Sequence, residues 1–297
     1  MNVNKPLLEW IDINKIYWFY LSKNPNAIQL LKANPEKINW KYLCLNTNPE
    51  AIELLRENKD KIYWYYLCKN TSDAAIELLK ENPTRINWKL ISLNTNAIEL
   101  LKTNPEKINW SFQCLKNINP TVIDFLKKNK NKIDWYCLSA NSNQEAVELL
   151  KTNPKKISWY NLSKNTNSDA IELLRENYYK IDWFNLSANN NDKAIQLLKE
   201  NQHKINWYYL SLNTNQGAIE LLKANKDKID WENLSLNTNP EAMELLKENK
   251  ERIDWVHLSL NTTQEAIELL KENQEMIDWI NFSENTSMFK NNELSSV

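Results

Sequence analysis

The stretch that decides the fold runs from Asn213 to Asn237 and reads NTNQGAIELLKANKDKIDWENLSLN. Variants of this stretch fill nearly all of the 297 residues, and twelve of the thirteen tryptophans stand in its Ile-x-Trp step, 22 to 25 residues apart. A period of this size is typical of stacked helical repeats. We name each copy after its tryptophan: Trp18, Trp40, Trp64, Trp88, Trp110, Trp135, Trp159, Trp183, Trp207, Trp231, Trp255 and Trp279.

Each copy is predicted to hold two helices. In the longer one, Asn48 is the N-cap, Pro49 opens the helix, and the apolar residues of 51–55 share one face. Asn58 ends it, and since the chain has only one Gly, we expect Asn to supply left-handed helix ends. A polar N-cap before the Trp begins the shorter helix, either α or 3-10. The fold class is therefore all-α, an α-solenoid of about twelve copies.

The domain organisation follows from where the repeat begins and ends. Residues 1–13 form a degenerate N-terminal cap, residues 14–283 a single elongated repeat domain, and residues 284–297 a C-terminal cap or tail. The net charge of −1 gives no general attraction to nucleic acid or anionic membranes. With no secretory signal or long apolar run, and with cysteines in a position usually held by Ser, we expect free thiols in a cytoplasmic, intracellular protein.

The repeat resembles two known groups. Its alternation of a longer and a shorter helix is similar to the leucine-rich repeat variant family, which implies a right-handed superhelix. The fuller pattern of Asn-Pro, Ala-Ile-x-Leu-Leu, Ile-x-Trp and Leu-Ser, as in residues 48–68, looks more like short helical repeat proteins encoded by giant DNA viruses. That resemblance implies a viral protein in the host cytoplasm, and it brings no catalytic or ligand motif.

Two basic rows repeat along the chain. One lies near the end of the longer helix, as at Arg56, and the other lies just before Ile-x-Trp, as at Lys61. They predict either a track for a nucleic-acid backbone or a solvated face with acidic partners three residues away, and the second interpretation is favoured. The Asn rows are assigned to helix capping rather than to ligand reading.

The two positions that follow each Trp, here the first and second post-Trp positions, vary while their neighbours repeat. Exposed aromatics there would bind a partner, whereas the alternative is that the first of the pair fills the seam between copies. The candidate partner-binding residues are Phe19, Tyr20, Tyr42, Tyr65, Tyr66, Phe112, Tyr136, Tyr160, Phe184, Tyr208 and Tyr209.

No catalytic constellation, metal site or cofactor motif is predicted from the pattern. The sequence favours a non-enzymatic, monomeric scaffold that binds a protein or peptide, with no membrane association. A single-stranded nucleic-acid-binding solenoid and a structural spacer or virion component are the alternatives.

Overall fold

The structure is a computed structural model that describes residues 6–94, 96–110 and 126–290. These residues form an all-helical fold of many short helices packed against their neighbours, without strands, although Leu7 and Phe289 form an isolated antiparallel bridge. In the described copies, the same helical segments recur at the same points of the repeat. Phe112 lies outside the described residues, so its predicted role stays a prediction.

In the described copies, the longer helix begins after an Asn, Ser, Thr or Ala and carries the Ala-Ile-x-Leu-Leu motif, with Val147 or Met243 in place of Ile in two of them. In α4 (Pro49–Glu57), the Asn48 side chain accepts a hydrogen bond from the Glu50 amide, which confirms the predicted N-cap. Ala51, Ile52 and Leu55 are fully buried. The other longer helices are α2 (Ile28–Ala33), α6 (Asp73–Lys80), α8 (Ile98–Lys102), α12 (Gln144–Lys151), α14 (Ser168–Glu176), α16 (Asp192–Glu200), α18 (Gln216–Ala224), α20 (Pro240–Glu248) and α22 (Gln264–Glu272).

The shorter helix is α-helical and starts at the Trp. Where the residue before the Trp is Asn, Asp or Ser, its side chain accepts a hydrogen bond from the backbone amide of the second post-Trp residue, as Asp182 does from Asn185. These helices are α1 (Trp18–Leu21), α3 (Trp40–Leu43), α5 (Trp64–Leu67), α7 (Trp88–Ile91), α11 (Trp135–Leu138), α13 (Trp159–Leu162), α15 (Trp183–Ser187), α17 (Trp207–Ser211), α19 (Trp231–Leu236), α21 (Trp255–Leu258) and α23 (Trp279–Phe282).

A 3-10 turn that the sequence analysis did not predict joins the two helices. It follows the Asn at the end of the longer helix, as η4 (Lys59–Lys61) follows Asn58. The other turns at this point are η1 (Ile13–Lys15), η3 (Pro35–Lys37), η5 (Pro83–Arg85), η6 (Pro105–Lys107), η7 (Lys130–Lys132), η8 (Pro154–Lys156), η9 (Tyr178–Lys180), η10 (Gln202–Lys204), η11 (Lys226–Lys228), η12 (Lys250–Arg252) and η13 (Gln274–Met276). Two more 3-10 turns, η2 (Pro25–Ala27) and η14 (Thr286–Met288), follow Asn24 and Asn285.

The expectation of left-handed Asn at the helix ends was wrong. No described residue has a positive φ, and Asn58 sits at φ −125° and ψ 58°. Its side-chain amide instead donates to the Leu54 carbonyl at 2.9 Å, so the side chain satisfies a helix-end carbonyl that a left-handed turn would otherwise satisfy. This explains how a chain with one Gly can end so many helices.

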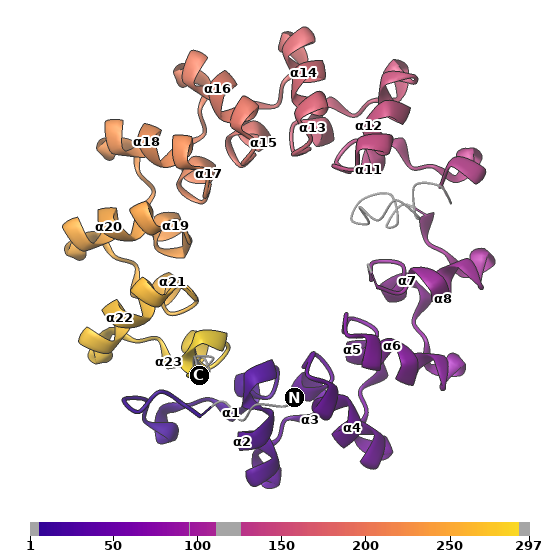
Figure 1. The fold of residues 1–297 in the computed structure, drawn as a ribbon, viewed down its shortest axis with the longest axis vertical. Coiled ribbons are helices and arrows are strands. Elements are labelled where there is room, and N and C mark those ends of the chain that lie inside the picture. Colours follow the sequence, from indigo (N-terminus) through magenta and orange to yellow (C-terminus); the bar gives the residue numbers. More distant parts are fainter. Residues whose placement is uncertain (1–5, 95, 111–125, 291–297) are drawn as a thin grey trace, which may run out of the picture. The chain divides into compact units, whose positions relative to one another are not determined.

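The contacts group the chain into two compact units, residues 1–103 with 254–297, and residues 104–253. In the second unit, the shorter helices α11, α13, α15, α17 and α19 form one row and the longer helices α12, α14, α16, α18 and α20 form another (Figure 1). Equivalent helices of successive copies pack on each other, as α14 does with α16 and α16 with α18. None of the helices in the described ranges is long and apolar enough to cross a membrane.

Candidate binding surface

Residues at the first post-Trp position point to solvent. The six aromatic ones are 41% to 57% exposed, and Val256 and Ile280 are 48% and 41% exposed. These side chains are therefore not buried between copies, although Phe19 and Phe184 each contact the second-position ring of the next copy. We call the six aromatic residues the exposed row: Phe19, Tyr65, Tyr136, Tyr160, Phe184 and Tyr208.

Residues at the second post-Trp position lie in the interface between successive copies, which we call the seam. Tyr42 stacks on Phe19 of the preceding copy with ring centroids 4.1 Å apart, and Tyr209 stacks on Phe184 at the same separation. All four tyrosines predicted for this position are half-buried: Tyr20, Tyr42, Tyr66 and Tyr209. The structure thus divides the predicted partner-binding residues into an exposed set and a set that contacts the neighbouring copy.

Where the second position holds Asn, a hydrogen bond replaces the ring contact. The side-chain amide of Asn161 donates to the Tyr136 carbonyl at 2.7 Å, and that of Asn185 donates to the Tyr160 carbonyl at 3.2 Å. Either residue type at this position therefore contacts the first post-Trp residue of the copy before it. The identity of the second position helps to hold the exposed row in place.

A ladder of buried asparagines joins the copies, and the sequence analysis missed it. The side-chain amide of Asn189 donates to the backbone carbonyls of Ser163 and Asn165 in the preceding copy at 3.1 and 2.9 Å, and its side-chain oxygen accepts from the Asn191 amide. The Asn ladder consists of Asn24, Asn46, Asn70, Asn94, Asn141, Asn165, Asn189, Asn213, Asn237, Asn261 and Asn285. In Asn189, as in the others, the side-chain oxygen caps the turn that follows, as predicted, while the side-chain NH₂ group of Asn189 bonds to the preceding copy.

A second ladder is formed by the Ser or Cys four residues after each Trp. The Ser187 hydroxyl donates to the Trp183 carbonyl at 2.8 Å and accepts from the Asn206 amide of the next copy at 2.9 Å. Cys44 takes the same place, where its sulfur accepts from the Tyr63 amide at 3.3 Å. Burial raises the pKa of the Cys44 thiol to about 11, so this free thiol is held in its neutral form. The described cysteines carry free thiols, as expected.

Several cations of the basic row before Ile-x-Trp lie over tryptophan rings. The Lys37 ammonium lies 4.4 Å from the centroid of the Trp18 ring, and Lys180 lies 4.5 Å from that of Trp159. These distances place each cation over the ring face of the preceding copy. The described tryptophans of the repeat are half-buried.

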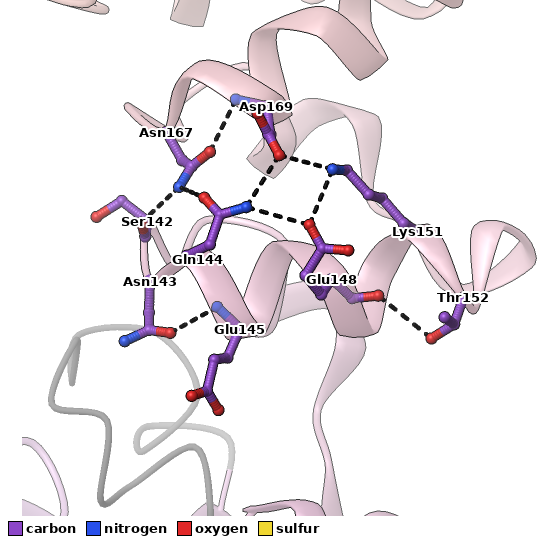
Figure 2. Close-up of polar contacts among 9 residues, drawn as sticks. All are labelled: Ser142, Asn143, Gln144, Glu145, Glu148, Lys151, Thr152, Asn167 and Asp169. Carbon is purple, nitrogen blue, oxygen red and sulfur yellow. Dashed lines mark hydrogen bonds and ion pairs between the residues drawn. The ribbon is translucent and has the colours of Figure 1, made fainter.

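The basic row of the longer helices is paired with carboxylates. Figure 2 shows Lys151 between Glu148 of its own helix, at 2.9 Å, and Asp169 of the next copy, at 2.6 Å. Hydrogen bonding to these carboxylates, chiefly Asp169, raises the pKa of Lys151, and the Lys151 ammonium lowers the pKa of Asp169. Similar pairs between copies join Lys127 to Glu145, Lys199 to Glu220, and Lys223 to Glu241.

In the described ranges, no group of three or more His, Cys, Asp or Glu side chains could hold a metal ion. His257 contacts its helix N-cap, with its Nδ1 2.9 Å from Asp254. A surface hollow of about 510 Å³ is lined by Trp40, Lys61 and Tyr63 among others, beside the cation-covered Trp40 ring.

The arrangement can offer apolar and aromatic contact area to a partner. No protein-family model, no curated protein and no solved structure matches the chain.

Proposed function

We propose that the chain is an α-solenoid of about twelve copies that acts as a non-enzymatic scaffold for a protein or peptide partner. The observation that carries the proposal is the exposed row. Six large aromatic side chains occupy a position that varies in sequence and stay 41% to 57% exposed in a fold that buries most of its other apolar residues. Tyrosines are favoured anchors of protein interfaces because they combine apolar area with a hydrogen-bonding hydroxyl.

The rigidity of the scaffold supports the same proposal. Side chains of the exposed row stand on short helices whose backbone is held by the neighbouring copy, for example through the bond from Asn185 to the Tyr160 carbonyl. Presenting side chains in a fixed arrangement lowers the entropy lost on binding. Some of these rings also have a cation nearby, as Tyr160 has Lys164 at 4.4 Å from its ring centroid, which adds a polar contact at the edge of the surface.

The charge pairing argues against a nucleic-acid track. A backbone-binding surface needs cations that can release counterions when phosphates bind. Here Lys151 contacts two carboxylates, and Lys37 and Lys180 lie over tryptophan rings. We therefore favour the protein or peptide partner over single-stranded nucleic acid, and no observation favours a spacer or virion role.

The test compares three forms of the full chain. We would immobilise the unmodified protein, a triple variant and a control. The triple variant combines Tyr136→Ser, Tyr160→Ser and Tyr208→Ser, and the control is Tyr179→Ser, whose fully exposed tyrosine lies outside the exposed row. Proteins retained from a lysate would be identified by mass spectrometry, and the affinity of each purified candidate would be measured. We expect at least about a 100-fold loss of affinity in the triple variant and none in the control.

Equal binding by the triple variant and the unmodified protein would contradict the proposal. Circular dichroism shows whether the variant keeps its helices, which we expect because the replaced side chains are largely exposed. A fluorescent single-stranded oligonucleotide serves as the competing probe. Tight binding that collapses between low and physiological salt would favour the nucleic-acid alternative instead.

A further inference from the structure

The two ends of the chain, which belong to the same compact unit, meet through the contacts that join successive copies. The side-chain amide of Asn24 donates to the Asn285 carbonyl at 3.1 Å, as Asn46 donates to the Asn24 carbonyl at 2.9 Å. The Tyr17 amide donates to the Ser283 hydroxyl at 2.9 Å, which repeats the geometry of the Ser ladder. Both ladders therefore continue from the last copy to the first.

The remaining contacts between copies recur at the same joint. The Lys15 ammonium lies 5.3 Å from the centroid of the Trp279 ring, in the relation that Lys37 has to Trp18. The side-chain amide of Asn26 donates to the Thr286 carbonyl at 3.0 Å, which reproduces the bond from Asn48 to the Pro25 carbonyl. The Asn ladder, the Ser ladder, the cation over the tryptophan ring and this Asn bond are thus all present between the Trp279 and Trp18 copies.

The C-terminal segment holds a 3-10 turn, η14, at the point where the longer helix starts in other copies. Met288 stands three residues after the ladder residue Asn285, as Ala97 stands three residues after Asn94. Met288 and Phe289 are 0% and 3% exposed. The residues at the equivalent points, Ala97 and Ile98, are 0% and 6% exposed. The apolar residues at the beginning of the motif are therefore present and buried at this end of the chain.

The described residues of the N-terminal segment are not helical before η1, but they stand where the end of the longer helix stands in other copies. Leu8 precedes Ile16 by eight residues, as Leu54 precedes Ile62, and η1 then stands where η4 stands in its copy. The Leu8 amide donates to the Met288 carbonyl at 3.0 Å. What looks in the sequence like a degenerate half-copy at the N-terminus is thus placed against the other half.

We propose that residues 285–290 and 6–18 together build one copy of the repeat, split between the two ends of the chain. Extended backbone holds the halves together, because the Lys290 amide donates to the Pro6 carbonyl at 2.8 Å beside the Leu7–Phe289 bridge. This split copy is a latch. In it, the first and last described copies cover each other's end faces, which is the role of capping repeats in stacked arrays.

The latch is tested by zero-length cross-linking of the full chain. Carbodiimide joins a Lys amine to a Glu carboxylate as an amide, with loss of water. The reporter pair is Lys23 and Glu284, 3.1 Å apart across the joint, and the control pair is Lys226 and Glu248, 3.4 Å apart between internal copies. We would mix chains of natural isotope content with 15N-labelled chains. We expect the reporter link at a yield within about twofold of the control link. Its two peptides should always carry the same isotope, because both come from one chain.

Two results would overturn the split copy within one chain. The first is the absence of the reporter link while the control link forms. The second is a reporter link that joins labelled to unlabelled chains, since that pairing would mean that the end faces join separate molecules head to tail.

A variant tests the C-terminal half directly. Phe289→Asp places a charge in the buried part of the latch and should lower the reporter yield at least about fivefold, with the control yield unchanged. Met276→Asp, at an exposed residue of the same end, should change neither. An unchanged reporter yield in Phe289→Asp contradicts the assignment. If the control link is lost as well, hydrogen exchange in the unmodified protein decides, because the split copy requires slow exchange of the Leu8 and Lys290 amides.

Discussion

The two residues after each tryptophan are neighbours in sequence but lie on different surfaces. Tyr208 is 49% exposed, whereas Tyr209 packs its ring 4.1 Å from Phe184 of the preceding copy. Where the second position holds Asn, its bond goes to the backbone of the first position, so the first side chain can vary without breaking the joint, while variation at the second must preserve a contact. A repeat protein of this kind can therefore change its surface at one position per copy without changing how the copies stack.

The largest effect should come from the seam, at the Asn ladder. Asn189→Ala removes three hydrogen bonds and leaves buried backbone groups of two copies without partners, so we expect a loss of about 3 kcal/mol in the free energy of unfolding. Urea denaturation followed by circular dichroism measures it. Asn190→Ala, at the exposed neighbour, is the matched control and should stay within about 0.5 kcal/mol. Similar losses in both variants would mean that the ladder is not what joins the copies.

Much of the helical pattern could be predicted from single copies. The apolar spacing of residues 51–55 and the polar N-cap at Asn48 are local signals, and the structure confirms both. The Asn ladder could not be found in this way, because the partner carbonyls of Asn189 lie 24 and 26 residues earlier in the sequence. Capping alone already explained an Asn at that point, so nothing in one copy called for a second role.

Other features were ambiguous for physical reasons. Asn tolerates both a left-handed turn and the conformation found at Asn58, and only the bond from its side chain to Leu54 distinguishes them. The shorter helix, as at Trp64–Leu67, is about one turn long, which is too short for periodicity to show which residue faces outward. The exposed half of the candidate site was therefore identifiable by residue type, but its separation from the seam half was not.

A second prediction tests the two positions against each other. Tyr209→Ala should lower the free energy of unfolding by about 2 kcal/mol, because the ring fills part of the seam against Phe184. Tyr208→Ala removes the same side chain from the adjacent, exposed position and should cost less than about 0.5 kcal/mol. Chemical denaturation of the two variants under one set of conditions gives the comparison. A larger loss in Tyr208→Ala would reverse the assignment of the positions.

A third prediction concerns the Ser ladder and has a natural reference within the chain. Ser187→Ala leaves the Asn206 amide without its acceptor and should cost about 1.5 kcal/mol. Ser187→Cys should recover at least half of that loss, because Cys44 and Cys68 accept the equivalent amides of Tyr63 and Asn87 at 3.3 Å. The measurement is the urea midpoint of both variants. No difference between Ala and Cys would mean that the position needs only a small side chain.

The smallest effect should come from the cations over the tryptophan rings, which lie at the border between the two surfaces. Lys180→Gln removes the charge 4.5 Å from the Trp159 ring centroid, and we expect a loss of about 0.5 kcal/mol together with faster acrylamide quenching of tryptophan fluorescence. Lys155→Gln, an exposed lysine outside this set of ring contacts, should change neither. If Lys180 instead belonged to a phosphate track, its removal would leave stability and quenching unchanged and weaken oligonucleotide binding. The two readouts therefore decide whether this row of charges belongs to the seam or to a ligand surface.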